Sequence, residues 1–296
     1  MKKFNLKKNF SSPETLEDLM FGCIRYFHLP PAEGRKVFQK QFLNFYKKKI
    51  NKKKKEINFK LNLREKIIFP FIKMGTLDSA GMFAYHEHNV FLFYFLKRFN
   101  YRCVADIGAN IGLHSILLSK FGYKVDAYEP DPDHLKILNK YLKKNRCKGV
   151  VTFNKAIFDS SKTLNFTKVI NNPAANHITG EKGIAYGPLK KIKVQSIDIN
   201  KIIRKYDFVK IDAEGSEGRI IERIKPSQYE KTDFVIEISG IENAKKIFYF
   251  CKKNKINIFS HKILWSNVKS IEDMPVHHTE GLIFISKNKK LLDFAK

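Results

Sequence analysis

Four small or polar residues alternate with apolar ones in one short segment, at Asp106, Gly108, Asn110 and Gly112. The segment lies between an apolar run and a helical pattern, where glycines let the backbone approach a ligand and free N–H groups at the helix start can hold an anion. It is not the G-x-G-x-x-G of dinucleotide sites, and an acid at the strand end would repel a pyrophosphate. This pattern suits a cationic ligand such as S-adenosylmethionine, which carries a sulfonium, an amino group and a carboxylate.

Further acids follow two other strand-like runs. Glu129 comes directly after KVDAY, where a carboxylate can accept hydrogen bonds from both hydroxyls of a ribose. Asp212 and Glu214 follow DFVKI, and Glu217 lies just beyond them. For Glu217 a purely structural role is equally open, because acids favour helix N-termini. We expect Glu129, Asp212 and Glu214 to face one ligand crevice.

The elements that must position these residues read as βαβ units from residue 101 onward, since short β-rich runs alternate with helical patterns. This alternation predicts an α/β, Rossmann-like fold with a mostly parallel central sheet and helices on both faces. Ligands of such sheets lie beyond the carboxyl ends of the strands. Strands are predicted at 103–107, 124–128, 150–157, 207–212, 233–239, 257–263 and 281–286, with strand-like pieces at 163–169 and 191–197. Helices are predicted at 111–121, 132–145, 216–224 and 243–254.

The first hundred residues differ from the rest in composition and pattern. Apolar residues recur there near the helical period, and two lysine runs, Lys47–Lys49 and Lys52–Lys55, lie in a segment almost without acids. We therefore expect a mainly helical, lysine-rich N-terminal region (1–100) followed by a ligand-binding domain (101–296). The lysine runs are expected to be a solvated face, with contact to an anionic membrane surface as the alternative.

The net charge of +27 on 296 residues raises the question of a nucleic-acid partner. The cations are 47 Lys and only 9 Arg, however, and Arg is the side chain suited to bidentate recognition of bases and phosphates. A lysine-rich, Phe- and Ile-rich chain fits a genome biased toward AT-rich codons. Nucleic acid is therefore not the expected partner.

The composition is that of a globular protein, and no apolar run approaches the roughly 20 residues that a membrane-spanning helix needs. The N-terminal MKKFNLKKNF is followed by no apolar signal-peptide region, so a cytoplasmic location is expected, with the inner face of a membrane as a peripheral contact. The cysteines Cys23, Cys103, Cys147 and Cys251 match no redox or zinc spacing and are expected to be free thiols.

Taken together, DIGANIGLHS, AYEPDP, NKAIFD and VKIDAEGSE resemble the FkbM family of S-adenosylmethionine-dependent methyltransferases. The resemblance runs from about Val104 to Ser239, with a looser tail to Ile285, and leaves residues 1–100 outside. The last of the four motifs is the most specific. The resemblance implies a class I methyltransferase fold and O-methylation, commonly of sugar hydroxyls on glycans, lipid-linked saccharides or secondary metabolites.

The resemblance also implies roles for individual residues. Asp106, Gly108, Asn110 and Gly112 would hold the methionine portion of S-adenosylmethionine, Glu129 the ribose and Ala156 the adenine edge. Asp212 and Glu214 would face the transferred methyl group and the acceptor as the catalytic residues.

A sugar hydroxyl is a poor nucleophile at neutral pH, so a general base should help. Asp212 or Glu214 could serve, as could His177 or His261 if their loops close over the site, whereas His114 is expected to be structural. A divalent cation such as Mg²⁺, held by Asp212 and nearby acids, is the alternative to a base. The sequence does not decide between base and metal.

The function expected from the sequence is O-methylation of a saccharide-type acceptor. Two rival functions remain open: methylation of RNA, and a non-catalytic basic adaptor at a membrane or glycan surface that keeps a degenerate fold. The RNA alternative lacks the Asn-Pro-Pro-aromatic type of motif after the fourth strand. The adaptor alternative is disfavoured because the loop glycines, Glu129 and Asp212 are all present.

Overall fold

The computed structural model describes residues 13–22, 29–74, 77–170, 172–182 and 187–286. The MKKFNLKKNF segment and Cys23 lie outside these described residues. Within them, Cys103, Cys147 and Cys251 are free, as expected. No helix in the described part of the chain is both long and apolar enough to cross a membrane.

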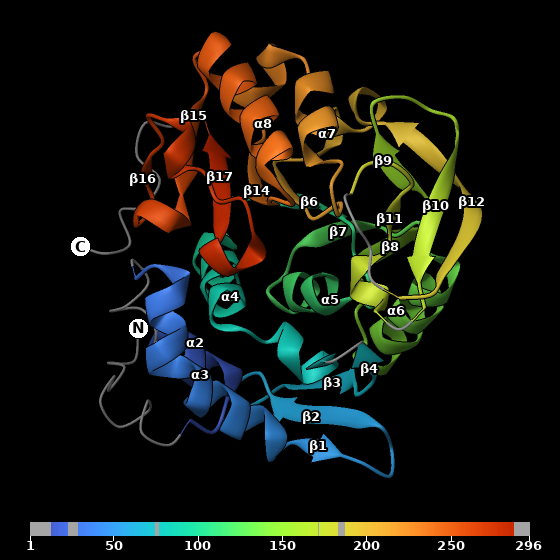
Figure 1. The fold of residues 1–296 in the computed structure, drawn as a ribbon. Helices are drawn as coiled ribbons and strands as arrows, with labels where there is room; N and C mark the ends of the chain where they lie inside the picture. The colour runs from blue at the N-terminus through green and yellow to red at the C-terminus, as the bar shows by residue number, and fades with distance from the viewer. Residues whose placement is uncertain (1–12, 23–28, 75–76, 171, 183–186, 287–296) are drawn as a thin grey trace.

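An eight-stranded sheet forms the centre of the molecule (Figure 1). Five neighbouring strands, in the order β14-β13-β6-β7-β8, are parallel, while β17 pairs antiparallel with β14 and β15. This confirms the predicted mostly parallel sheet. The strands are β6 (Cys103–Ile107), β7 (Lys124–Tyr128), β8 (Val150–Phe153), β13 (Phe208–Ile211), β14 (Asp233–Glu237), β15 (Asn257–Ser260), β16 (Ser266–Asn267) and β17 (Leu282–Ser286).

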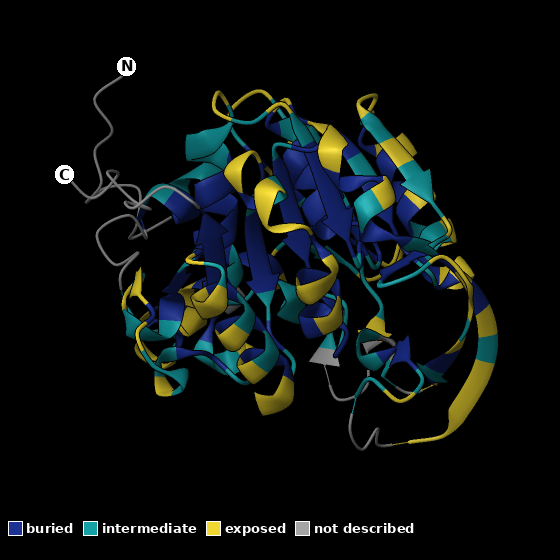
Figure 2. Ribbon diagram, turned by 90° about the horizontal axis from the view of Figure 1, so that it is seen from above, coloured by how far each residue is buried: buried dark blue, intermediate teal, exposed yellow. Residues whose placement is uncertain are grey.

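Helices cover both faces of this sheet, because its strands are apolar on both sides. On one face, Val104, Val125 and Phe208 pack against α4 (Tyr85–Lys97), α5 (Leu113–Lys120) and α6 (Pro132–Lys144). On the other face, the alternate strand residues pack against α7 (Glu217–Arg223) and α8 (Ile241–Lys253). Figure 2 shows the strands buried between helices whose outer faces are exposed.

The strand order reverses direction at β6, since β7 and β8 lie on one side of it and β13 and β14 on the other. A crevice forms at the carboxyl ends of the strands where an α/β sheet reverses in this way. The loops after β6, β7, β13 and β14 therefore meet at one edge of the sheet, the edge where the sequence places its candidate residues.

The N-terminal region contains helices, as expected, and also a sheet that the helical pattern did not predict. Besides α4, its helices are α2 (Leu16–Gly22) and α3 (Pro31–Lys47). The antiparallel sheet has the order β1-β2-β3. EINFK and KIIFP pair with apolar residues at alternate positions, a period of two that a search for helical spacing passes over. The strands are β1 (Ile50–Asn51), β2 (Glu56–Lys60) and β3 (Lys66–Pro70), and a small hairpin follows in β4 (Lys73–Met74) and β5 (Leu77–Asp78).

The lysine run Lys52–Lys55 forms the turn between β1 and β2, and all four of its residues are exposed. It is the solvated face that the sequence analysis expected. The turn lies at the tip of a hairpin rather than on a helix (Figure 1).

The N-terminal region and the central sheet share one hydrophobic core. The ring of Phe93 on α4 lies 5.5 Å from that of Phe208 on β13 and 5.2 Å from that of Phe284 on β17. Gly34 of α3 lies so close to α4 that an added Cβ would be 1.9 Å from the ring of Tyr85. The boundary at residue 100 thus separates two kinds of sequence but does not separate two cores.

A second sheet is inserted between β8 and β13, with the order β11-β10-β12-β9. The single strand predicted at 150–157 is split between the two sheets. Asn154 lies at the break, and its side-chain amide donates to the carbonyls of Glu129 and Pro130 at 3.0 Å each. The chain then enters β9, which pairs in parallel with β12. The strands are β9 (Ala156–Phe158), β10 (Thr163–Val169), β11 (His177–Ile178) and β12 (Leu189–Asp198).

Candidate functional site

The glycine loop after β6 is in direct contact with the end of β13. Gly108 has φ of +74°, and a Cβ placed on it would be 1.8 Å from the carbonyl oxygen of Asp212. Only glycine fits at this position, because both the backbone conformation and the space exclude a side chain. The N–H groups of Gly108 and Ala109 both donate to the carbonyl of Tyr128 at 3.0 Å. The ends of β6, β7 and β13 are therefore held together.

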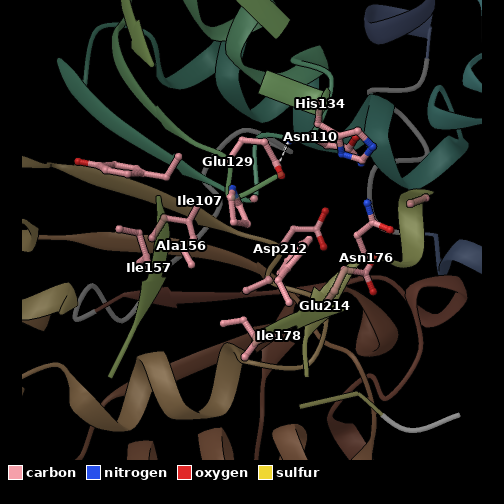
Figure 3. A pocket seen from close by; sticks show the side chains of 16 residues that line it. Ile107, Asn110, Glu129, His134, Ala156, Ile157, Asn176, Ile178, Asp212 and Glu214 are labelled. Atoms are coloured by element: carbon pink, nitrogen blue, oxygen red, sulfur yellow. Dashed lines mark hydrogen bonds between the residues drawn. The ribbon is translucent and has the colours of Figure 1, made fainter. Parts of the chain in front are cut away.

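Asn110 and Glu129 form the next part of the site (Figure 3). Asn110 has φ of 50°, a left-handed conformation that asparagine tolerates. Its N–H donates to Oε2 of Glu129 at 2.7 Å, and the N–H of Asp131 donates to Oε1 at 2.8 Å. Each carboxylate oxygen keeps a second lone pair for a ligand hydroxyl. Burial raises the pKa of Glu129 to about 8, although both backbone hydrogen bonds favour its charged form.

These residues line an open cleft whose empty space, including the part that is open to solvent, is about 570 Å³. Six of the eight predicted site residues line it: Gly108, Asn110, Glu129, Ala156, Asp212 and Glu214. The sequence analysis did not foresee that the inserted sheet and the segment between its strands β10 and β11 form the facing wall. That wall is made by Phe166, Ala174, Asn176 and Ile178.

The other two predicted residues, Asp106 and Gly112, do not line the cleft. Asp106 is fully buried, its Oδ2 accepts a hydrogen bond of 2.6 Å from the Ser115 hydroxyl, and its Oδ1 lies 3.5 Å from Lys210 Nζ. Gly112, with φ of +97°, precedes α5, and a Cβ there would be 3.1 Å from Leu138. Both residues therefore stabilise the glycine loop on the side that faces away from the cleft.

The turn after β13 presents Asp212 and Glu214 at the end of the cleft (Figure 3). Glu214 has φ of 49° and Gly215 has φ of +112°. The carboxylate of Glu217 holds this turn by accepting from the N–H groups of Ala213 at 3.1 Å and Gly215 at 3.0 Å. Of the two roles left open for Glu217, the structure gives it the structural one. A left-handed conformation at a non-glycine residue is strained and is common at functional sites.

The electrostatic environment distinguishes Glu214. Burial, followed by the neighbouring charge of Asp212, raises the pKa of Glu214 to about 7, against the opposing effect of its ion pair with Lys182. A carboxyl group with a pKa near 7 is divided between its acid and base forms at neutral pH. It can therefore take up or release a proton there.

Lys210 is a residue of this site that the sequence analysis missed. It is only 4% exposed, and its ammonium lies 3.4 Å from Asp212, 3.5 Å from Asp106 and 3.2 Å from the carbonyl of Gly108. Burial opposes its charge, but Asp212, Asp106 and two further carboxylates keep the pKa of Lys210 above its usual value. The missed signal was a lysine between two apolar residues of a buried strand, at the position that shares a face with Asp212.

The three histidines considered from the sequence do not line the cleft. His261 is fully buried, its ring is stacked on Trp265, and burial lowers its pKa to about 3. His177 donates from Nδ1 to the carbonyl of Ala175, and its chain neighbours line the cleft instead. His114 lies 3.2 Å from Glu87 and 3.1 Å from the hydroxyl of Tyr94. Another histidine, His134, lines the cleft beside Glu129.

The model of the FkbM methyltransferase domain matches residues 106–265, more than half of the chain. The chain belongs to this family. The match begins at Asp106 and includes every predicted site residue, and it confirms the resemblance inferred from the sequence. The fold is the class I methyltransferase fold, as the resemblance implied.

Solved structures were also compared with this family member. An FkbM methyltransferase from Methylobacillus flagellatus is 16% identical, with a TM-score of 0.39, and the match covers 62% of this chain and 43% of that protein. A precorrin-6y C5,15-methyltransferase from Geobacter metallireducens is 14% identical, with a TM-score of 0.40, and the match covers 73% of this chain and 95% of that one. No curated protein sequence matches the chain.

The family implies S-adenosylmethionine as the cofactor, and the residues of the cleft fit it. Gly108 provides a space that any Cβ would fill, and the Oδ1 atom of Asn110 is buried without a hydrogen-bond partner among the described residues. Ala156, Phe166 and Ile178 offer an apolar wall for a planar base. Carboxylates at the other end of the cleft suit a positively charged group. The cleft is therefore apolar where the adenine would lie and acidic where the sulfonium would lie.

Proposed function

We propose that this chain is an S-adenosylmethionine-dependent O-methyltransferase that acts on a hydroxyl of a saccharide or glycan-type acceptor. The observation that carries the proposal is the contact between Gly108 and the carbonyl of Asp212. This contact joins the glycine loop to the turn that bears two carboxylates, so a ligand in the cleft ends beside Asp212 and Glu214.

In this proposal the chain holds the cofactor by groups of three kinds. Glu129 binds the ribose hydroxyls through the free lone pairs of its carboxylate, and Ala156 with its apolar neighbours binds the adenine. Gly108, Asn110 and the acids near Asp212 hold the methionine portion. When bound, S-adenosylmethionine supplies a methyl group activated by its attachment to a positively charged sulfur. Holding the acceptor in line with that methyl group can account for much of the rate.

Glu214 is the group we assign to removal of the acceptor proton. Its pKa of about 7 leaves a substantial fraction of it as carboxylate at neutral pH, and it lines the cleft next to Asp212. Asp212 lies 3.4 Å from Lys210 and orients the acceptor hydroxyl by accepting a hydrogen bond from it. A hydroxyl needs such a base because its own pKa is far above 7.

The acceptor class follows from the family resemblance and is supported by the polar character of the site. Several carboxylates with few fixed partners can accept hydrogen bonds from the many hydroxyls of a sugar. The exposed lysines Lys47, Lys48 and Lys52–Lys55 support a further proposal, that an enzyme of the cytoplasm contacts an anionic membrane carrying a lipid-linked acceptor.

The experiment that tests the function is calorimetric titration of the purified protein with S-adenosylmethionine and S-adenosylhomocysteine, with NADH as the control ligand. We expect both sulfur ligands to bind with micromolar dissociation constants and NADH not to bind. Methyl transfer from labelled cofactor is then measured with saccharide acceptors and, in parallel, with RNA. Transfer to RNA alone would replace the saccharide proposal, and failure to bind either sulfur ligand would refute the enzyme proposal and favour the adaptor.

A further inference from the structure

Three potential ligand groups meet on the side of Asp212 away from the glycine loop. His86 and Glu87 are in the first turn of α4, and Glu237 is the last residue of β14. One atom from each, an imidazole nitrogen or a carboxylate oxygen, lies within 4.8 Å of the other two. The shared core brings them together, because α4 packs across the sheet through Phe93 and its neighbours.

The side chains of this cluster have few partners within the described residues. His86 is only 6% exposed, and the nearest acid to its Nε2 is Glu87 Oε1 at 3.7 Å, too long for a hydrogen bond. The carboxylate of Glu237 makes no hydrogen bond or ion pair within the described part of the chain. A nine-tenths buried imidazole and a partly buried carboxylate thus lie close to one another, and neither makes a hydrogen bond to a described residue.

The carboxylates around the cluster outnumber the ammonium that faces them. Lys210 lies between Asp106 and Asp212, and its charge also acts on Glu87 and Glu237. His114 lies 3.2 Å from Glu87. Among the described residues, four carboxylates thus face one buried ammonium, and a further cation is the kind of ligand that such an excess of negative charge favours.

We propose that His86, Glu87 and Glu237 form a binding site for a divalent transition cation such as Zn²⁺ or Mn²⁺. One imidazole and two carboxylates are a donor set that such ions accept, whereas Mg²⁺ prefers oxygen ligands alone. Three protein ligands leave coordination positions open, as in catalytic rather than structural sites. The site differs from the magnesium site considered from the sequence, which was built on Asp212.

The inference deepens the proposed function and rests on it only for the role of the cation. The cluster adjoins Asp212 on the β14 side, while the cofactor cleft lies on the β6 side. A cation there would hold an acceptor hydroxyl next to the carboxylates that take its proton, and it would lower the pKa of that hydroxyl. The N-terminal region, which lies outside the family match, would thus supply two of the three ligands.

The test is a direct binding measurement on the full chain without a histidine tag, after treatment with a chelator. ZnCl₂ and MnCl₂ are titrated calorimetrically, with MgCl₂ in parallel. We expect one equivalent of Zn²⁺ or Mn²⁺ per chain and much weaker binding of Mg²⁺. Glu237→Gln and, separately, His86→Gln should each weaken binding at least about tenfold, in line with loss of one ligand.

Two matched controls carry the same chemical changes at exposed positions. Glu242→Gln alters a glutamate on α8 whose side chain is 74% exposed, and His277→Gln alters an exposed histidine. Both should bind the cation as the unmodified chain does. Circular dichroism spectra verify that each variant is folded, and having two ligand variants keeps the test valid if one of them does not fold.

The outcomes separate this inference from the proposed function. Absence of stoichiometric cation binding by the folded chain overturns the site, as does unchanged binding in both ligand variants. S-adenosylhomocysteine is titrated into the same samples. If S-adenosylhomocysteine binds while the cations do not, the cation site is wrong and the methyltransferase proposal stands. If the cations bind at these residues and S-adenosylhomocysteine does not, the cation site is correct and the methyltransferase proposal fails.

Discussion

The two sides of Asp212 are built in different ways. The cofactor half, which we define as Gly108, Asn110, Glu129 and Ala156, comes from consecutive βα turns within fifty residues of the chain. The acceptor half, defined as His86, Glu87, Lys210 and Glu237, comes from three elements spread over some 150 residues. In the first, glycines and backbone N–H groups determine the shape. In the second, side chains from distant elements meet because the fold places them together.

The largest effect we expect comes from the residue between the two halves. Asp212→Asn keeps the size of the side chain but removes the charge that faces Lys210 at 3.4 Å. Turnover should fall by about 10²-fold, because the acceptor hydroxyl loses the carboxylate that orients it toward the methyl group. S-adenosylhomocysteine binding, measured by calorimetry, should change by less than a few fold. Turnover close to that of the unmodified enzyme would remove Asp212 from the catalytic assignment.

The second prediction concerns a variant that disrupts only the cofactor half. Gly108→Ala places a Cβ 1.8 Å from the carbonyl of Asp212 and should abolish S-adenosylhomocysteine binding. Gly122→Ala is the matched control, because Gly122 has a similar φ of +97° but no atom within 4 Å of the added Cβ. Both variants suffer the left-handed backbone cost of about 1–2 kcal/mol, seen as a lower midpoint of thermal unfolding. Equal binding in the two would show that the contact with Asp212 is unimportant.

A third, smaller effect is expected at the ribose end of the cleft. Glu129→Gln replaces one of the two oxygens that accept from the N–H groups of Asn110 and Asp131 with an amide nitrogen, which cannot accept. The lost hydrogen bond and the N–H left without a partner should weaken cofactor binding by roughly 10–100-fold, or about 1.5–3 kcal/mol. Binding of Mn²⁺ to the acceptor half, followed by the paramagnetic resonance of the ion, should not change. A simultaneous loss of both ligands would mean that the halves are not independent.

The fourth prediction concerns pH. Protonated Glu214 cannot accept a proton, so kcat/KM should rise as the pH increases through about 7 and then level off. The charged groups facing Glu214 are Asp212, Lys182, Lys210 and Glu237. In Glu214→Gln this rise should be absent and the remaining rate should be flat across pH 6–8. A rise of the same midpoint in the variant would assign it to another group.

The smallest effect on turnover is expected at the β1–β2 turn, which contributes no residue to either half. Replacing Lys52–Lys55 with serine removes four exposed charges and should leave turnover on a soluble saccharide unchanged. Binding to vesicles containing phosphatidylserine should weaken, at about 1 kcal/mol per lysine near the surface, and this difference should shrink as salt increases. Equal vesicle binding at low salt would exclude the turn as a membrane contact.

The sequence predicts the cofactor half better than it predicts the acceptor half. The cofactor half was predictable, because a glycine loop between a strand and a helix acts through local backbone geometry. Glu129 needed only its place after the second strand. The ends of β6, β7 and β10 also match the predicted strands to the residue, since each is an apolar or alternating run with clear ends.

The acceptor half was not predictable, because no local pattern relates His86 to Glu237. Their proximity depends on how α4 crosses the sheet, which is a property of packing between distant segments. Lys210 could have been predicted as a site residue, since a lysine inside a buried strand requires a charged partner. The split of the strand was missed because the hydrogen bonds of Asn154 to a distant turn decide it, whereas the sheet made by β1–β3 was missed because its period of two was not sought.

The single core has a consequence for how this protein could be altered. Helix α4 is at once a structural support of the sheet, through Phe93, and the carrier of two acceptor-side groups. A truncation to residues 101–296 would therefore expose the apolar face formed by Phe208 and Phe284 and, in the same step, remove two of the four residues of the acceptor half. The same link between stability and specificity constrains evolution, because a substitution in α4 that changes the acceptor must also leave the protein able to fold.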